Sequence, residues 1–245
     1  VFPRDGKINM STTSISFNGV PYICLNYTKN ISQARTLAHE IGHAAHDFYA
    51  KENNKIEYFE VSLFLTEVVA KVNEFLFNDY LLEHSNQEER DYYLSNIISS
   101  LKISLFDQVM LTEFETTIIT SIEKGQIPSL EEINQLYYNL YKEYNGDSMT
   151  YDSCIQYGWC LIQHFVLQES YYLYQYSLSS SLAMAIVYKL KMDASFLNKY
   201  KEFLMLGNTL SIEESLSFLG INLYDETIYE DTFKSLDDKI LEIKF

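Results

Sequence analysis

The residues best suited to chemistry lie in the segment HEIGHAAH at residues 39–46. His39, Glu40 and His43 form an H-E-x-x-H pattern. Residues four apart lie on one face of an α-helix, so both imidazoles can bind the same metal ion, with Glu40 within reach of a water molecule on it. This arrangement is typical of zinc peptidases, which use two ligands and a general base. The alternative is a helix that carries two capped or core histidines.

The pattern requires a third protein ligand. One class of zinc peptidase takes it from a third histidine further along the same helix, but Tyr49 occupies that position here. His46 lies on the same face of the helix. At a rise of about 1.5 Å per residue it is roughly 10 Å along the axis from His39, too far for both to bind one zinc. We therefore expect His46 to support the site, face substrate or pack in the core.

A glutamate on the next helix is the better source of the third ligand, and a His₂Glu site results. Apolar residues at helical spacing predict a helix over residues 57–83. Glu60, Glu67 and Glu74 repeat every seven residues along it. Glu67 is the most enclosed by apolar neighbours, and a carboxylate buried there needs a partner such as a metal. A solvated acidic edge of the helix remains the alternative, mainly for Glu60 and Glu74.

A second candidate segment is HFVLQESYYLYQY at residues 164–176. Tyr171 and Tyr174 are three positions apart, so in a helix their hydroxyls can project from one face. A tyrosine hydroxyl, or the ring N–H of His164, can donate a hydrogen bond to the oxyanion of a tetrahedral intermediate. The alternative is an aromatic core whose tyrosine hydroxyls reach the surface.

Composition excludes several classes of protein. A net charge of −16 argues against nucleic-acid binding, which needs clustered Lys and Arg. The odd number and irregular spacing of Cys24, Cys154 and Cys160 predict reduced thiols in a cytoplasmic protein. The sequence has no apolar run of about 18 residues and no signal peptide, so we expect no membrane partner.

The low content of glycine and proline, eight and three in 245 residues, favours long helices. Near the start, residues 20–27 predict a buried strand with residues 14–18 as its hairpin partner and Asn18–Gly19 as the turn. Since no linker divides the chain, we expect a single domain over residues 1–245. The predicted helices run from a Ser32 N-cap to about Tyr49, then over 57–83, 87–123 and 129–144, the last capped by Ser129.

Together the segments HEIGHAAH and TEVVAKVNE (residues 66–74) resemble the M3 metallopeptidases, and within them oligoendopeptidase F. The resemblance covers nearly the whole chain. It implies that His39, His43 and Glu67 bind one Zn²⁺ per chain and that Glu40 is the general base acting on a zinc-activated water. Glu74 matches the second glutamate of the family's segment, which implies a role beside the ligands.

The aromatic segment also resembles the family, in which a histidine and tyrosines opposite the zinc bind substrate and the transition state. His164 and Tyr174 match that segment well and Tyr171 matches it fairly, so the resemblance implies catalytic roles for all three. Tyr172 and Tyr176 are alternative candidates for the tyrosine roles. Gln168 and Glu169 depart from the family pattern, since relatives often carry an aromatic residue or glycine there.

The resemblance implies a mainly α fold, a zincin-like helical catalytic domain with a small β-hairpin near the N-terminus. It also implies a zinc-dependent endopeptidase that hydrolyses short peptides. Only 38 residues precede His39. We therefore expect the catalytic C-terminal portion of such an enzyme, without the N-terminal helical region of full-length relatives. Two alternatives are a non-catalytic helical scaffold that binds a metal or a partner, and an exopeptidase of another His₂Glu family.

Overall fold

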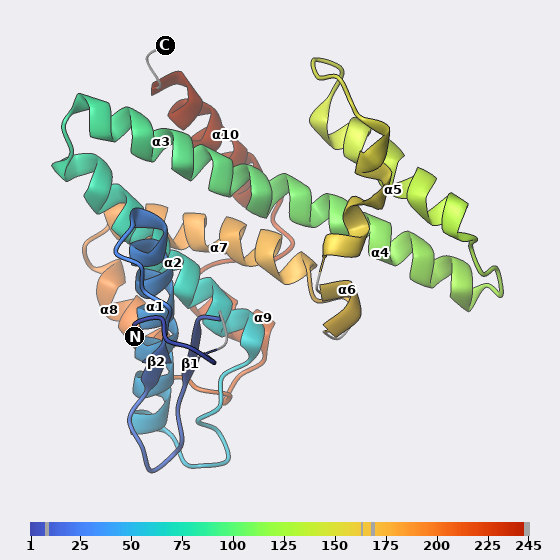
Figure 1. Ribbon diagram of the computed structural model, residues 1–245. Coiled ribbons are helices and arrows are strands. Elements are labelled where there is room, and N and C mark those ends of the chain that lie inside the picture. The colour runs from blue at the N-terminus through green and yellow to red at the C-terminus, as the bar shows by residue number, and fades with distance from the viewer. Residues whose placement is uncertain (8–9, 163, 168–169, 243–245) are drawn as a thin grey trace. The chain divides into compact units, whose positions relative to one another are not determined.

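The computed structural model describes residues 1–7, 10–162, 164–167 and 170–242 (Figure 1). It is mainly helical with a small antiparallel sheet near the N-terminus, as predicted. Within the described residues, no helix is long and apolar enough to cross a membrane. The elements are β1 (Thr12–Ser14), β2 (Tyr22–Cys24), α1 (Ile31–Asn53), α2 (Leu63–His84), α3 (Gln87–Lys102), the π-helix η1 (Ile103–Asp107), α4 (Gln108–Glu123), α5 (Leu130–Asn145), the 3₁₀-helix η2 (Ser153–Leu161), α6 (His164–Leu167), α7 (Tyr174–Met192), α8 (Phe196–Leu204), α9 (Ile212–Phe218) and α10 (Thr227–Glu242).

The chain packs as two compact units, one of Val1–Ile98 with Ser179–Phe245 and one of Ser99–Leu178. The first unit holds the hairpin, α1 and α2. Its core includes side chains with no exposed surface, among them Val68, Leu182 and Leu216. The expectation of one domain over residues 1–245 stays a prediction.

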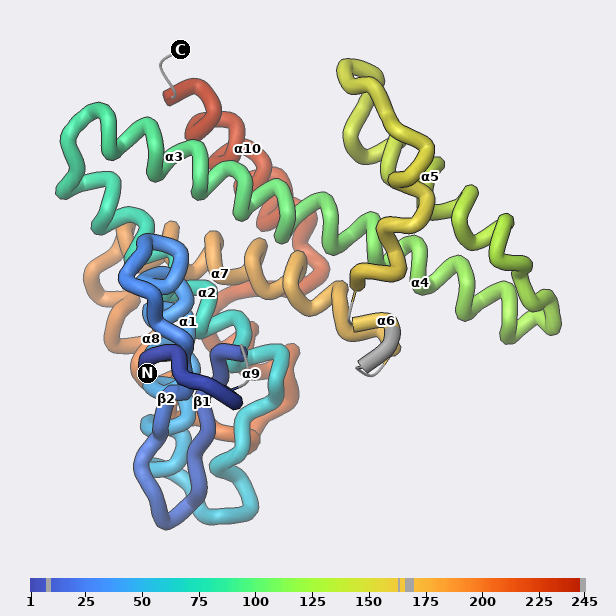
Figure 2. Tube along the Cα trace, in the orientation of Figure 1, coloured from blue at the N-terminus to red at the C-terminus, as the bar shows by residue number. Residues whose placement is uncertain are grey.

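Strands β1 and β2 form the hairpin near the N-terminus (Figure 2). Thr13 pairs with Ile23 in this hairpin. Its first strand lies earlier than the predicted 14–18, because the backbone N–H of Gly19 donates to the carbonyl of Ser16 at 2.9 Å and forms the turn there. The chain then enters α1, which Asn30 caps by accepting a hydrogen bond from the N–H of Gln33 at 2.9 Å. Ser32, the predicted cap, already lies in the first helical turn.

Helix α2 begins at Leu63 rather than near residue 57, because Ser62 caps it with a bond from the N–H of Leu65. The residues before the cap are held by distant parts of the chain. The backbone N–H of Asn208 donates to the carbonyl of Tyr58 at 2.7 Å, and the Asn54 amide donates to Met205 at the same distance. These bonds replace the helical bonds that the apolar pattern predicted.

Helices α1 and α2 pack very closely at Gly42. A Cβ atom at this position would lie 2.6 Å from the Cα of Ala70, so only glycine fits without moving the backbone. The amide of Asn73 also donates to the Ala38 carbonyl at 2.5 Å. A glycine inside a helix costs about 1 kcal/mol relative to alanine, which indicates a close neighbour, and here that neighbour is α2. The approach brings the H-E-x-x-H turn of α1 against the glutamates of α2.

In the second unit, a π-helical segment interrupts the single helix predicted over residues 87–123, and Lys102 pairs with Asp107 across it. Helix α5 begins with the predicted cap, a reciprocal pair between Ser129 and Glu132. The aromatic segment lies against the core of this unit, which contains Met110, Leu111, Phe114, Tyr137, Leu140 and Leu173.

Candidate metal centre

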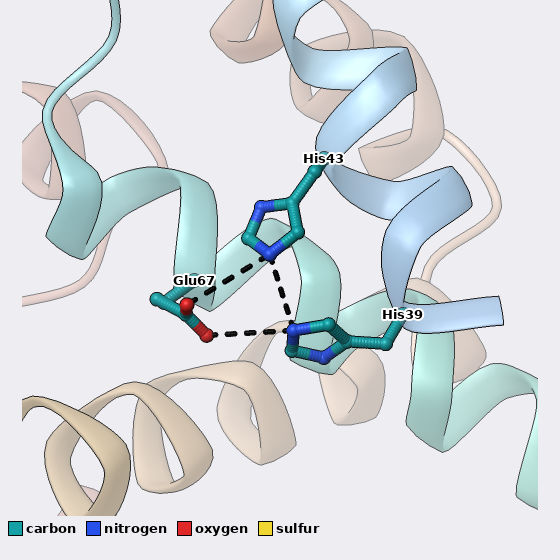
Figure 3. Close-up of side chains that lie close together, drawn as sticks. All are labelled: His39, His43 and Glu67. Atoms are coloured by element: carbon teal, nitrogen blue, oxygen red, sulfur yellow. Dashed lines mark hydrogen bonds and ion pairs between the residues drawn. The ribbon is translucent and has the colours of Figure 1, made fainter. Parts of the chain in front are cut away.

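Three side chains from two helices of the first unit converge on one point (Figure 3). His39 and His43 project from successive turns of α1, and their Nε2 atoms lie 3.1 Å apart. Glu67 reaches them from α2, with its carboxylate 3.6 Å from His39 Nε2 and 3.8 Å from His43 Nε2. The structure therefore brings together the three residues that the sequence predicted as ligands.

The donor atoms of this cluster fit a zinc ion. All three lie within 4.8 Å of one another. Zinc binds histidine nitrogen and carboxylate oxygen at about 2.0–2.2 Å, so two ligands on a tetrahedral ion are separated by about 3.3 Å. Oε2 of Glu67 is buried without a hydrogen-bond partner, and an unpaired buried oxygen is costly. A cation between the three side chains would satisfy it.

Burial sets the charge of the cluster. It lowers the pKa of His43 to about 3, with His39 adding to the effect. The ring is therefore neutral at physiological pH, which is the form that binds metal. Burial also raises the pKa of Glu67, while His39 and Lys71 oppose the rise. A cation bound between the three side chains would favour the ionised form of Glu67 and so lower its pKa.

Neighbouring groups orient both histidine rings. Nδ1 of His43 lies 3.0 Å from the Thr66 hydroxyl, and Nδ1 of His39 lies 3.5 Å from Oε2 of Glu74. Lys71 binds the same Glu74 oxygen at 2.9 Å. Burial raises the pKa of Glu74, but Lys71 and His39 outweigh it and bring that pKa to about 2. Ionised Glu74 thus fixes the His39 ring with Nε2 toward the cluster, a common arrangement at zinc sites.

The side chain of Glu40 is buried beside the ligands, with 5 % of the residue exposed. One of its oxygens, Oε2, accepts a hydrogen bond from the hydroxyl of Thr13 at 2.7 Å. Sequence reasoning did not identify Thr13, Thr66 or Lys71. A single hydroxyl or ammonium has no characteristic spacing, and Thr13 reaches Glu40 only because the hairpin folds onto α1.

Other predicted positions lie apart from the cluster. His46 is buried against the ring of Phe203 at a centroid distance of 5.7 Å, so of its three predicted roles the structure supports packing. Burial lowers its pKa to about 3. Glu60 is exposed and precedes α2, so the seven-residue stripe includes only Glu67 and Glu74.

The aromatic segment belongs to the second unit. Nε2 of His164 lies 3.2 Å from the Tyr176 hydroxyl, and burial lowers the His164 pKa while Glu115 opposes this. Tyr171 precedes α7, so its predicted helical face shared with Tyr174 is wrong. Tyr171 instead has a left-handed backbone with φ of 62°, and its N–H donates to Glu115 at 3.1 Å.

The first residue of α7 is Tyr174, which is 42 % exposed. Tyr174 therefore lies at a helix end on the surface of this unit and not in its core. The two positions where the family pattern is broken, Gln168 and Glu169, lie outside the described residues.

Comparison with known proteins identifies the family. The model of peptidase family M3 matches residues 1–235. The chain belongs to this family. Among curated family M3 relatives, it is 31 % identical over 246 residues to oligopeptidase PepF of Bacillus subtilis. It is 28 % identical over 242 residues to the chromosomal oligoendopeptidase F of Lactococcus lactis subsp. cremoris.

The crystal structure of oligoendopeptidase F from Enterococcus faecium gives a TM-score of 0.73 at 29 % identity, over 87 % of this chain and 39 % of that one. The alignment with the Bacillus protein covers all of this chain and 36 % of that protein. The alignment with the Lactococcus protein covers 98 % of this chain and 40 % of that protein. The chain thus spans about two fifths of the length of these M3 relatives. Within this family M3 chain, His39, His43 and Glu67 form a group that could hold a metal ion.

Proposed function

We propose that this chain forms the catalytic part of a zinc endopeptidase that hydrolyses short peptides, with one zinc held by His39, His43 and Glu67. The observation that carries the proposal is the three-donor cluster with a buried glutamate beside it. The similarity to an oligopeptidase and to oligoendopeptidases F supports short peptides as the substrate class.

The residues of the cluster and its neighbours have separate roles in hydrolysis. Zinc, when bound, supplies a Lewis acid that polarises the scissile carbonyl and acidifies water. The Glu40 carboxylate takes a proton from the attacking water and then delivers it to the departing amine nitrogen. Glu74 and the Thr66 hydroxyl keep the two histidine rings oriented through their Nδ1 atoms.

We assign His164, Tyr174 and Tyr171 to the stabilisation of the tetrahedral oxyanion and to substrate binding. Each offers a donor, the imidazole N–H or a phenol O–H, of the kind that an oxyanion requires. The Glu115 contact supports Tyr171 in particular, because a strained backbone held by a side chain from another element is common at functional sites.

Metal removal tests the proposal as a whole. The purified chain should carry about one zinc and cleave a quenched peptide whose amino terminus is acetylated; the chelator 1,10-phenanthroline should stop cleavage, and added zinc should restore it. Zinc binding without cleavage would favour the scaffold. Cleavage only of the free-amine form of the peptide would favour an exopeptidase. No transition metal after a zinc soak would contradict both the site and the function.

Replacing Tyr174 with phenylalanine deletes one hydroxyl and keeps the ring. If this hydroxyl donates to the oxyanion, kcat should fall by about 10²–10³-fold with little change in melting temperature. Tyr188→Phe is the matched control, because Tyr188 is exposed on the same helix. Loss of activity in Tyr172→Phe or Tyr176→Phe, with Tyr174→Phe fully active, would show that Tyr174 is the wrong donor.

A further inference from the structure

The hydroxyl of Thr13 lies against the buried glutamate of the H-E-x-x-H turn. Its Oγ1 is 2.7 Å from Oε2 of Glu40 and 3.0 Å from the backbone carbonyl of the same residue. Thr13 thus contacts both ends of one glutamate from a separate element. A threonine that only filled space between strand and helix would not need both contacts.

The hairpin holds Thr13 in this place. Thr13 is the middle residue of β1 and pairs with Ile23 of β2, and the residues before and after it are also paired with β2, so its backbone position is fixed. Side chains alternate along a strand, which directs Thr13 to one face and its neighbour Thr12 to the other. Among the side-chain contacts of the described residues, the Thr12 hydroxyl has one local contact, 3.4 Å from the Thr13 carbonyl.

Hydrogen-bond chemistry determines which atom of Glu40 accepts the proton of the Thr13 hydroxyl. A threonine hydroxyl has one proton to donate, and bonds to an ionised acceptor are shorter and stronger than those to a neutral carbonyl. The 2.7 Å contact with Oε2 is therefore the favoured bond. This bond takes one of the two lone pairs of Oε2 and favours one rotamer of the carboxylate, whereas none of the side-chain hydrogen bonds given for the described residues reaches Oε1, which keeps both lone pairs for a proton.

Proton transfer depends on this kind of placement. A general base must lie within about 2.6–3.2 Å of the proton it takes, and a misplacement of about 1 Å can cost roughly 100-fold in rate. A free Glu40 carboxylate could rotate about its side-chain torsions away from the reacting position. The Thr13 bond restricts that rotation without touching a metal ligand.

We propose that Thr13 is a positioning residue for Glu40, which it orients so that Oε1 is the proton acceptor. The proposal rests on the proposed role of Glu40 as general base and adds to it a residue outside the metal-binding helices. Because Thr13 touches neither His39, His43 nor Glu67 in the contacts given above, its effect should appear in catalysis and not in metal binding.

Thr13→Val, which replaces the hydroxyl by a methyl group of similar size, tests this proposal. In zinc-loaded protein we expect kcat for a quenched peptide to fall by about 10- to 100-fold, with KM, zinc content and zinc dissociation constant unchanged. Thr13→Ser, which keeps the hydroxyl, should recover most of kcat. Thr12→Val is the matched control on the same strand and should behave as the wild type.

The outcomes separate this proposal from the proposed function. If Thr13→Val does not fold, Thr13→Ser and Thr13→Ala replace it, since they differ by one hydroxyl oxygen. Wild-type kcat in Thr13→Val or Thr13→Ala, with Glu40→Gln inactive, would overturn the role of Thr13 alone. An active Glu40→Gln would overturn the general base itself. An equal loss in Thr12→Val, or a loss of zinc in Thr13→Val, would show that the strand acts only as structural support.

Discussion

Glu40→Gln should lower peptide hydrolysis by about 10²–10⁴-fold, the usual contribution of a general base, while the protein keeps its zinc. The amide has nearly the shape of the carboxylate but cannot accept a proton from water. Its carbonyl oxygen can still accept the bond from Thr13, so the hairpin should stay in place. Measurement of kcat/KM together with zinc content by elemental analysis separates the two effects.

Glu60→Gln is the matched control for this substitution, because Glu60 is exposed and precedes α2. It makes the same change of one carboxylate to an amide and should leave both activity and zinc content as in the wild type. Activity of Glu40→Gln within tenfold of the wild type would exclude Glu40 as the base. A parallel loss of zinc would instead show that Glu40 supports the metal site.

The three-donor cluster could be predicted from sequence because the spacing of its residues carries the information. An α-helix places His39 and His43 on one face whatever the rest of the fold does. Glu67 could be singled out because apolar residues surround it, and it is in fact buried with 8 % exposure. Gly42 was also informative, since its cost to helix stability indicated a close neighbour.

Contacts between distant parts of the chain explain what the sequence did not reveal. The apolar pattern continues through residues 57–62. The bonds that Asn54 donates to Met205 and that Asn208 donates to Tyr58 nevertheless hold this segment outside the helix. Glu60 therefore leaves the predicted stripe. Thr13 could not be singled out from the sequence either, because its partner lies 27 residues away and the predicted first strand, residues 14–18, begins after it.

In the aromatic segment, too, contacts between distant residues decide a conformation that spacing along the sequence did not predict. Counting three positions from Tyr171 to Tyr174 assumes a continuous helix, but α7 begins only at Tyr174. Tyr171 has a left-handed backbone, which a tyrosine adopts only when its surroundings impose it. Glu115, which accepts the hydrogen bond from its N–H, lies on α4 and has no pattern that links it to this turn.

Glu67→Ala should weaken zinc binding by more than about 100-fold. Loss of a group that merely supports a ligand costs about 10- to 100-fold in metal affinity, and loss of a ligand should exceed that. The same reasoning predicts a smaller loss for Glu74→Gln, because Glu74 contacts the Nδ1 of His39 and lies outside the three-donor cluster. Competition with a chelator of known affinity measures both dissociation constants.

Thermal unfolding gives an independent readout of the ligand assignment. Zinc that binds only the folded chain stabilises it by about 4 kcal/mol at 1,000 times the dissociation constant, so added zinc should raise the melting temperature of the wild type. Glu67→Ala should lose this rise, Glu74→Gln should retain part of it, and the exposed Glu60→Ala should retain all of it. If Glu67→Ala still responds fully to zinc while Glu60→Ala or Glu74→Ala does not, the third ligand is one of those glutamates and the geometry in Figure 3 does not describe the metal-bound protein.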